Sequence, residues 1–189
     1  MNVAQIGQLV WYVTGRFYSK DNLLQDVGYF LHLQGLESPL FPDGTKNETT
    51  AYFTFSSTPF QSGSVQNAGL GVGIDERGTF GIYLRDTPGA SFDDPASFAE
   101  GTCIATFSRT SIVATTQIAA APSGVGLLSN VFSAQLVSST PFTFAGVQYD
   151  FRELVGTGVT QWGTAATEPI APPSGYAAVV PFVGSALRF

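Results

Sequence analysis

Apolar and polar side chains alternate along most of this chain, which is the pattern of strands with one buried face. Residues 49–56 show it clearly, because Phe53 and Phe55 fall on one face while Tyr52 and Thr54 fall on the other. Few segments have the 3.6-residue period of a helix. The segments that we predict as strands are 8–18, 27–34, 49–56, 102–108, 111–118, 131–138, 142–152 and 177–187, together with a hairpin over 68–84.

Glycine and proline divide the chain into these short pieces, since it contains 21 Gly and 11 Pro. Two stretches between predicted strands are candidates for a helical turn. Residues 21–26 are one, and residues 94–99, with Pro95 at the first helical position, are the other. Neither is long enough for the crossover helix that joins parallel strands.

The predicted strands are sequential neighbours, so we expect an all-β protein of about eight to ten antiparallel strands in one domain over residues 1–189. A barrel is favoured over a β-sandwich because closure removes the edge strands, and this chain has few lysines (Lys20 and Lys46) to protect exposed edges. Residues 170–189 are predicted to form the final strand after a proline-rich turn.

Composition excludes several classes of protein. The 189 residues carry a net charge of −6, only 12% are charged and 13% are aromatic, which excludes disorder and disfavours nucleic acid and anionic membranes as partners. So weakly charged a surface favours a homo-oligomer. No apolar stretch reaches the roughly 18 residues of a membrane-spanning helix, and the first residues do not resemble a secretory signal. We therefore expect a cytoplasmic protein.

Familiar catalytic arrangements are absent from the sequence. There is one histidine, His32, and one cysteine, Cys103, so neither a disulfide nor a structural zinc site of about four Cys/His ligands is expected. Cys103 lies in an apolar run and is predicted to be a buried small side chain. The glycines 69, 71 and 73 alternate within a strand and do not open a helix, so a dinucleotide-binding loop is rejected. No cofactor is predicted.

The alternate glycines favour close approach of another group to that strand face, most simply an aromatic side chain of the same chain. We predict that ligand-contacting residues come from the aromatic strands and from one cation near a barrel mouth. The predicted residues are Tyr29, His32, Phe53, Phe55 and Arg109. By default Arg109 is a rim charge, and by exception it anchors an anion or a carbonyl.

Two pairs of charged residues have structural and functional interpretations. Asp93 and Asp94 precede Pro95, where helix capping or solvation is favoured over cation binding. Asp150 and Arg152 share one face of a predicted strand, and a polar outer face is the expected meaning. If that face were interior, the two would form a buried ion pair.

Three functions are compatible with this inventory. The first is a barrel that binds a hydrophobic or aromatic small molecule in its interior. The second is a cofactor-independent isomerase or cyclase that closes a ring by orienting a polyene in an apolar cavity. Such an enzyme resembles allene oxide cyclase and the barrel-shaped Diels–Alder cyclases. The resemblance is an analogy of fold alone, since none of their motifs is present. The third is a structural assembly subunit.

Overall fold

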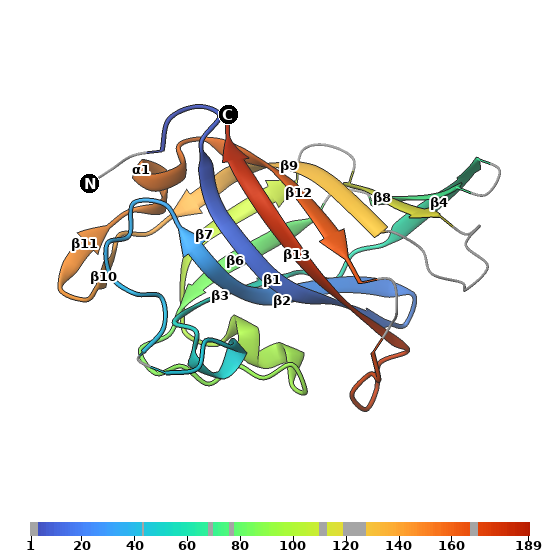
Figure 1. Ribbon diagram of the computed structural model, residues 1–189, viewed down its shortest axis with the longest axis horizontal. Coiled ribbons are helices and arrows are strands. Elements are labelled where there is room, and N and C mark those ends of the chain that lie inside the picture. The colour runs from blue at the N-terminus through green and yellow to red at the C-terminus, as the bar shows by residue number, and fades with distance from the viewer. Residues whose placement is uncertain are drawn as a thin grey trace.

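The computed structural model describes residues 4–42, 44–67, 70–75, 78–109, 113–118, 128–166 and 170–189. Eight antiparallel strands form a closed β-barrel in the order β12-β13-β1-β2-β3-β6-β7-β9, and pairing of β9 with β12 closes it (Figure 1). The predicted all-β antiparallel barrel is therefore confirmed. Closure leaves these eight strands without a free edge along their paired lengths.

Strands β1 (Leu9–Lys20) and β2 (Leu23–Leu33) form a long hairpin at the front of the barrel in Figure 1. The prediction of a helical turn at 21–26 is wrong. Asp21 and Asn22 have φ values of 52° and 62°, the left-handed conformation that a two-residue hairpin turn requires. β2 starts directly after them.

The next strands in the barrel are β3 (Phe53–Ser57), β6 (Thr79–Leu84) and β7 (Thr102–Arg109). Two short 3-10 helices, η1 (Glu48–Thr50) and η2 (Pro95–Ala99), lie in the connections that flank them. The helical turn predicted at 94–99 is confirmed as η2. It packs against β2, β3 and β6, so this side of the barrel has a second layer outside it.

Three strands complete the barrel: β9 (Leu128–Ser139), β12 (Gly158–Ala165) and β13 (Ala178–Arg188). β13 is the predicted final strand after the proline-rich turn, and it pairs with β1 and with β12. β12 falls outside every predicted strand. Its inward positions include Gln161 and Gly163, so the alternation of apolar residues that marks the other strands is weak here.

Strands β4 (Ser62–Asn67), β5 (Leu70–Asp75) and β8 (Val113–Ile118) continue the sheet away from β9 and project from the barrel at the right of Figure 1. The predicted hairpin over 68–84 is wrong, because β5 pairs with β4 and β8 while β6 pairs with β3 and β7. The expected turn residues 76 and 77, and the glycine at 69, lie outside the described residues.

A small hairpin of β10 (Phe142–Phe144) and β11 (Val147–Tyr149) and the helix α1 (Phe151–Val155) close one end of the barrel. The single strand predicted over 142–152 is therefore wrong. Ala145 and Gly146, with φ values of 49° and 81°, turn the chain after three residues. Asp150 caps α1 by accepting a hydrogen bond from the Arg152 backbone N–H at 2.8 Å, and Arg152 is exposed, so the pair is not a buried ion pair.

Aromatic side chains fill the barrel interior. Trp11 contacts Phe30 and Phe107 edge to face, with ring centroids 5.9 and 5.6 Å apart, and Phe30 contacts Phe55 in the same way. In this geometry the positive edge of one ring faces the negative face of the next, which favours a single arrangement of the rings. Phe182 reaches into the same interior from β13 and packs against Phe55.

Two facing glycines make room for these rings. Gly15 on β1 pairs with Gly28 on β2. A Cβ on Gly28 would lie 2.7 Å from the Phe55 ring, and a Cβ on Gly15 would lie 2.9 Å from the Phe182 ring. Close approach of aromatic rings is thus found at Gly15 and Gly28, whereas the surroundings of the alternate glycines at 69, 71 and 73 lie outside what the structure describes, so that prediction stays untested.

In the described part of the chain, no helix is long and apolar enough to cross a membrane.

Candidate functional site

A buried ion pair lies among the aromatic side chains toward the end of the barrel opposite the β10–β11 hairpin (Figure 1). Nη2 of Arg109, at the end of β7, donates to both carboxylate oxygens of Asp26 on β2, at 2.7 and 2.8 Å. Both side chains are nearly inaccessible, with 3% and 8% exposed. The default prediction of a rim position for Arg109 is wrong, since the residue follows Phe107 by two and shares its inward face.

Three phenyl rings surround the guanidinium of Arg109. Its Cζ lies 4.9 Å from the ring centroid of Phe60, 5.5 Å from that of Phe80 and 5.1 Å from that of Phe132. Cation–π attraction and the Asp26 carboxylate together offset the cost of removing this charge from water.

The polar interior is not fully satisfied. Nε and Nη1 of Arg109 and Nδ2 of Asn130 are buried and have no hydrogen-bond partner among the residues that the structure describes. A buried donor without an acceptor costs on the order of 1–3 kcal/mol. A carbonyl, a hydroxyl or a water molecule beside Arg109 would supply the missing acceptor.

The space that the described residues enclose inside the barrel is small. A cavity of about 10 Å³ is bounded by Asp26 and Gln161 and by the rings and side chains of Trp11, Val13, Phe30, Phe55, Phe80 and Phe132. Gln161 accepts a hydrogen bond from the Trp11 indole N–H at 2.8 Å. This volume holds about one water molecule. The prediction of a ligand inside the barrel therefore has little open space to support it, because aromatic side chains occupy the centre.

A much larger hollow lies at the end of the barrel that the hairpin closes. This end groove has a volume of about 640 Å³ and separates the segment 38–42 from the β10–β11 hairpin. It is lined by Ser38, Pro39, Phe41, Pro42, Tyr52, Leu84, Arg85, Asp86, Thr143, Phe144 and Ala145. Its volume falls within the roughly 300–1,000 Å³ of small-molecule sites.

The aromatic walls of the end groove are held from behind by core rings. Phe144 packs on Phe53 with ring centroids 4.9 Å apart, and Phe41 packs on Tyr29 at 6.0 Å. Tyr52 contacts Phe144 across the groove wall at 5.5 Å. Since the supporting rings are themselves buried, the three wall rings are held in place before any ligand arrives.

The end groove is lined by one basic and one acidic residue, Arg85 and Asp86. Arg85 is occupied, because Nη1 donates to the Ser97 carbonyl and Nη2 pairs with the Glu100 carboxylate at 3.1 Å. Asp86 is exposed and forms no ion pair with a described residue. The groove therefore combines three rings with one carboxylate that is free to accept a hydrogen bond.

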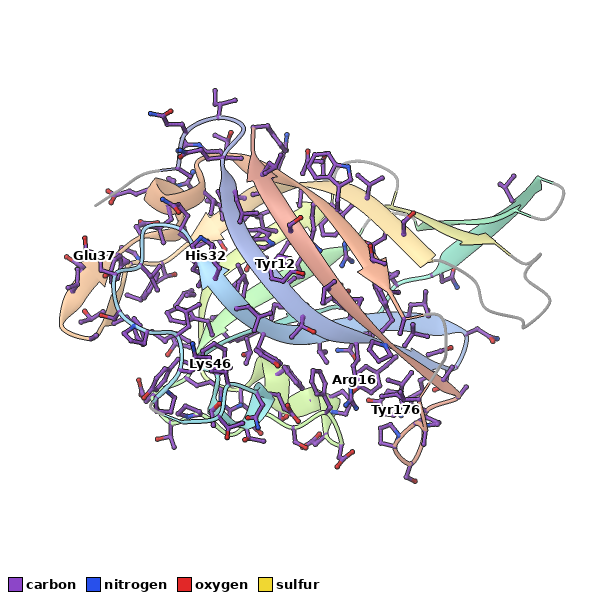
Figure 2. The ribbon with its side chains drawn as sticks, viewed as in Figure 1. Tyr12, Arg16, His32, Glu37, Lys46 and Tyr176 are labelled. Carbon is purple, nitrogen blue, oxygen red and sulfur yellow. The ribbon has the colours of Figure 1, made fainter. Side chains whose placement is uncertain are left out.

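The five predicted ligand-contacting residues are not brought together at one place. Arg109 and Phe55 lie inside the barrel, while Phe53 and Tyr29 stand directly behind the walls of the end groove. His32 is exposed on the outer wall, next to Tyr12 (Figure 2). The prediction missed Asp26 and the groove walls. Asp26 could have been predicted as an inward residue, because it alternates with Gly28 and Phe30 along β2.

Titratable and nucleophilic groups elsewhere form no further site in the described residues. The prediction that Cys103 is buried is wrong, because its thiol is exposed on the outer face of β7. No group of three or more His, Cys, Asp or Glu side chains within the described ranges could hold a metal ion. Burial raises the pKa of Tyr18 to about 12 and also raises the pKa of Tyr29. Both phenols stay neutral at physiological pH.

Comparison with models of protein families gives no match, and comparisons with curated proteins and with solved structures give none either.

Proposed function

We propose that this protein binds a hydrophobic or aromatic small molecule, and that the end groove is where it binds. The observation that carries the proposal is the open volume of about 640 Å³ between Phe41, Tyr52 and Phe144. Apolar area removed from water there contributes roughly 25 cal/mol per Å². The wall rings are already in position, so little ordering cost opposes binding.

The groove also favours a particular orientation of the ligand. Apolar faces of the ligand pack against Tyr52 and the exposed edges of Phe41, Phe144 and Leu84, which are otherwise buried, and a donor group such as a hydroxyl or an amine points toward Asp86. An anionic ligand is disfavoured, since the Arg85 guanidinium is neutralised by Glu100 and Asp86 adds a negative charge.

The barrel interior is the alternative location for the same ligand class. Its support is the two guanidinium nitrogens of Arg109 beside an aromatic cavity, Nε and Nη1, that lack an acceptor among the described residues. A guest larger than water must displace rings such as Phe80 and Phe132 there, because the cavity holds only about 10 Å³. The end groove needs no such displacement and is preferred for that reason. A ring-closing enzyme and an assembly subunit stay predictions.

A fluorescence titration tests this proposal. The neutral probe N-phenyl-1-naphthylamine brightens when it leaves water for an apolar site, and we expect saturable brightening with the wild-type protein. Thr143→Trp places an indole in the groove from the exposed face of β10 and should remove most of this brightening. Gln148→Trp is the matched control, because Gln148 is the exposed cross-strand partner of Thr143 but does not line the groove.

Each outcome of this titration has a defined meaning. Loss of binding in Thr143→Trp with retention in Gln148→Trp supports the end groove. Equal binding by both variants moves the site away from the groove, to the interior or elsewhere. No saturable binding by the wild-type protein overturns the proposed function.

A further inference from the structure

A second hollow lies on the outer wall of the barrel, away from the end groove. It has a volume of about 200 Å³ and spans three neighbouring strands, β1, β13 and β12. Its lining residues are Tyr12, Trp162, Gly163, Thr164, Val183, Gly184 and Ser185. We call it the outer hollow.

Strand register places two aromatic rings on opposite sides of the outer hollow. Tyr12 on β1 and Trp162 on β12 both pair with Ser185 on the strand between them. Neighbouring strands are about 4.8 Å apart, so the two backbones are separated by roughly 10 Å with a small side chain between them. Residues that flank Trp162 point inward, as the hydrogen bond from Trp11 to Gln161 shows, so Trp162 itself points outward.

Both rings are exposed and have unused polar groups. Tyr12 is 38% and Trp162 is 47% exposed, although indole and phenol rings of this size are mostly buried in globular proteins. Within the described parts of the chain, nothing hydrogen-bonds the Trp162 indole N–H or the Tyr12 hydroxyl. Each ring therefore offers an apolar face together with a free polar group.

The floor of the outer hollow is polar but uncharged. Ser185 and Thr164 contribute hydroxyl groups, and the seven lining residues include no acid and no base. The ligand that complements such a site has apolar faces, many hydroxyl groups and no charge. Charged ligands would lose hydration without gaining a counter-ion.

We infer that the outer hollow binds a neutral oligosaccharide made of pyranose rings with equatorial hydroxyl groups. Such rings present flat C–H faces that pack on Trp162 and Tyr12, while their hydroxyl groups hydrogen-bond Ser185 and Thr164. The site is independent of the proposed function, because the two hollows share no lining residue.

A second copy of this chain is the competing occupant of this face. A stable interface buries about 800 Å² on each partner, with protruding side chains that fill hollows. The seven residues here form a concave strip with a floor of glycine, serine and threonine, which suits a narrow chain of rings. We therefore commit to the oligosaccharide and leave self-association as an outcome of the test.

Calorimetric titration with cellohexaose tests the inference. We expect saturable binding by the wild-type protein, and a loss of affinity of roughly tenfold or more in Trp162→Ala and in Tyr12→Ala. Phe189→Ala is the matched control, because Phe189 is a 44% exposed aromatic residue that lies outside the hollow, and its affinity should equal that of the wild type. Oligogalacturonate, an anionic chain of similar length, should not bind.

A second readout guards against variants that fold poorly. Trp11→Phe leaves Trp162 as the only tryptophan, so its emission should shift on addition of cellohexaose. Unchanged emission together with no heat of binding overturns the inference, and so does wild-type affinity in Trp162→Ala. A wild-type dimer that becomes monomeric in Trp162→Ala, with no sugar bound, also overturns it and assigns the face to self-association.

Discussion

Nη2 of Arg109 bridges both carboxylate oxygens of Asp26 inside the barrel, although the two residues are 83 positions apart in the chain. The bridge ties β7 to β2 across an interior that is mostly aromatic. Its stability is conditional, because each charge is tolerable there only while the other is present.

Replacing one partner should be much worse than replacing both. Asp26→Asn leaves the buried Arg109 charge uncompensated and should destabilise the protein by about 3–5 kcal/mol. Arg109→Met with Asp26→Asn removes both charges and should recover most of that loss. Urea unfolding of the wild type, the two single variants and the double variant measures the coupling. A loss below about 1 kcal/mol in Asp26→Asn would mean that the pair is open to water.

Gly15 and Gly28, which pair across the β1–β2 hairpin, should not tolerate a side chain. Gly28→Ala places a Cβ 2.2 Å from the Thr14 carbonyl oxygen and 2.7 Å from the Phe55 ring, so we expect a loss of about 3 kcal/mol or failure to fold. Gly146→Ala is the control: it has open space but a φ of 81°, and should cost only about 1 kcal/mol. Thermal unfolding compares them. Equal small losses would place the Phe55 ring elsewhere.

Alkaline pH should weaken the fold through Tyr18. Its hydroxyl donates to the Phe92 carbonyl at 2.6 Å, and burial raises the pKa to about 12 from an ordinary 10. A raised pKa in the folded state means that the stabilisation is complete below pH 10 and is lost as pH rises toward 12. The loss is up to about 3 kcal/mol.

Urea midpoints at pH 9 and pH 11.5 measure this loss. Tyr18→Phe should be less stable than the wild type at pH 9, since it lacks the hydrogen bond to Phe92. It should also lose less stability between the two pH values. An identical alkaline loss in both proteins would assign the effect to other tyrosines, such as Tyr29 and Tyr83, whose pKa values burial also raises.

The two tryptophans should report opposite environments. Trp11 is 1% and Trp162 is 47% exposed, so acrylamide should quench Trp162→Phe about fivefold less than Trp11→Phe. Trp162→Phe should also emit at shorter wavelength. Similar quenching of both single-tryptophan proteins would show that the interior around Trp11 is open to solvent.

Local patterns predicted the barrel well, because strand alternation reflects which side chains face inward. The strand predictions failed where this alternation of apolar and polar residues is interrupted. β12 places Gln161 and Gly163 inward, and the turn at Ala145 divides a predicted strand into two. The end groove could not be predicted either, because the residues that line it are far apart in the sequence. Phe41 and Phe144 form one groove only because the closed barrel brings a loop after β2 against the β10–β11 hairpin.

A charged residue on an inward face was the hardest feature to interpret from sequence. Arg109 follows the pattern set by Phe107, but a cation is expected to leave the interior unless a partner is present. That partner, Asp26, comes from a distant strand, and its register with Arg109 depends on closure of the sheet. Alternation can therefore predict which face of the strand Arg109 occupies. Identifying Asp26 as its partner requires knowledge of the folded structure.

A crystal structure of the protein soaked with N-phenyl-1-naphthylamine is the most direct test of the ligand-binding account. We predict density for the probe between Phe41, Tyr52 and Phe144, with Trp11, Phe80 and Phe132 unmoved inside the barrel. If the end groove is free of lattice contacts and still holds no probe, the groove is not the binding site. Probe density inside the barrel, with the interior rings displaced, would also contradict the groove as the binding site.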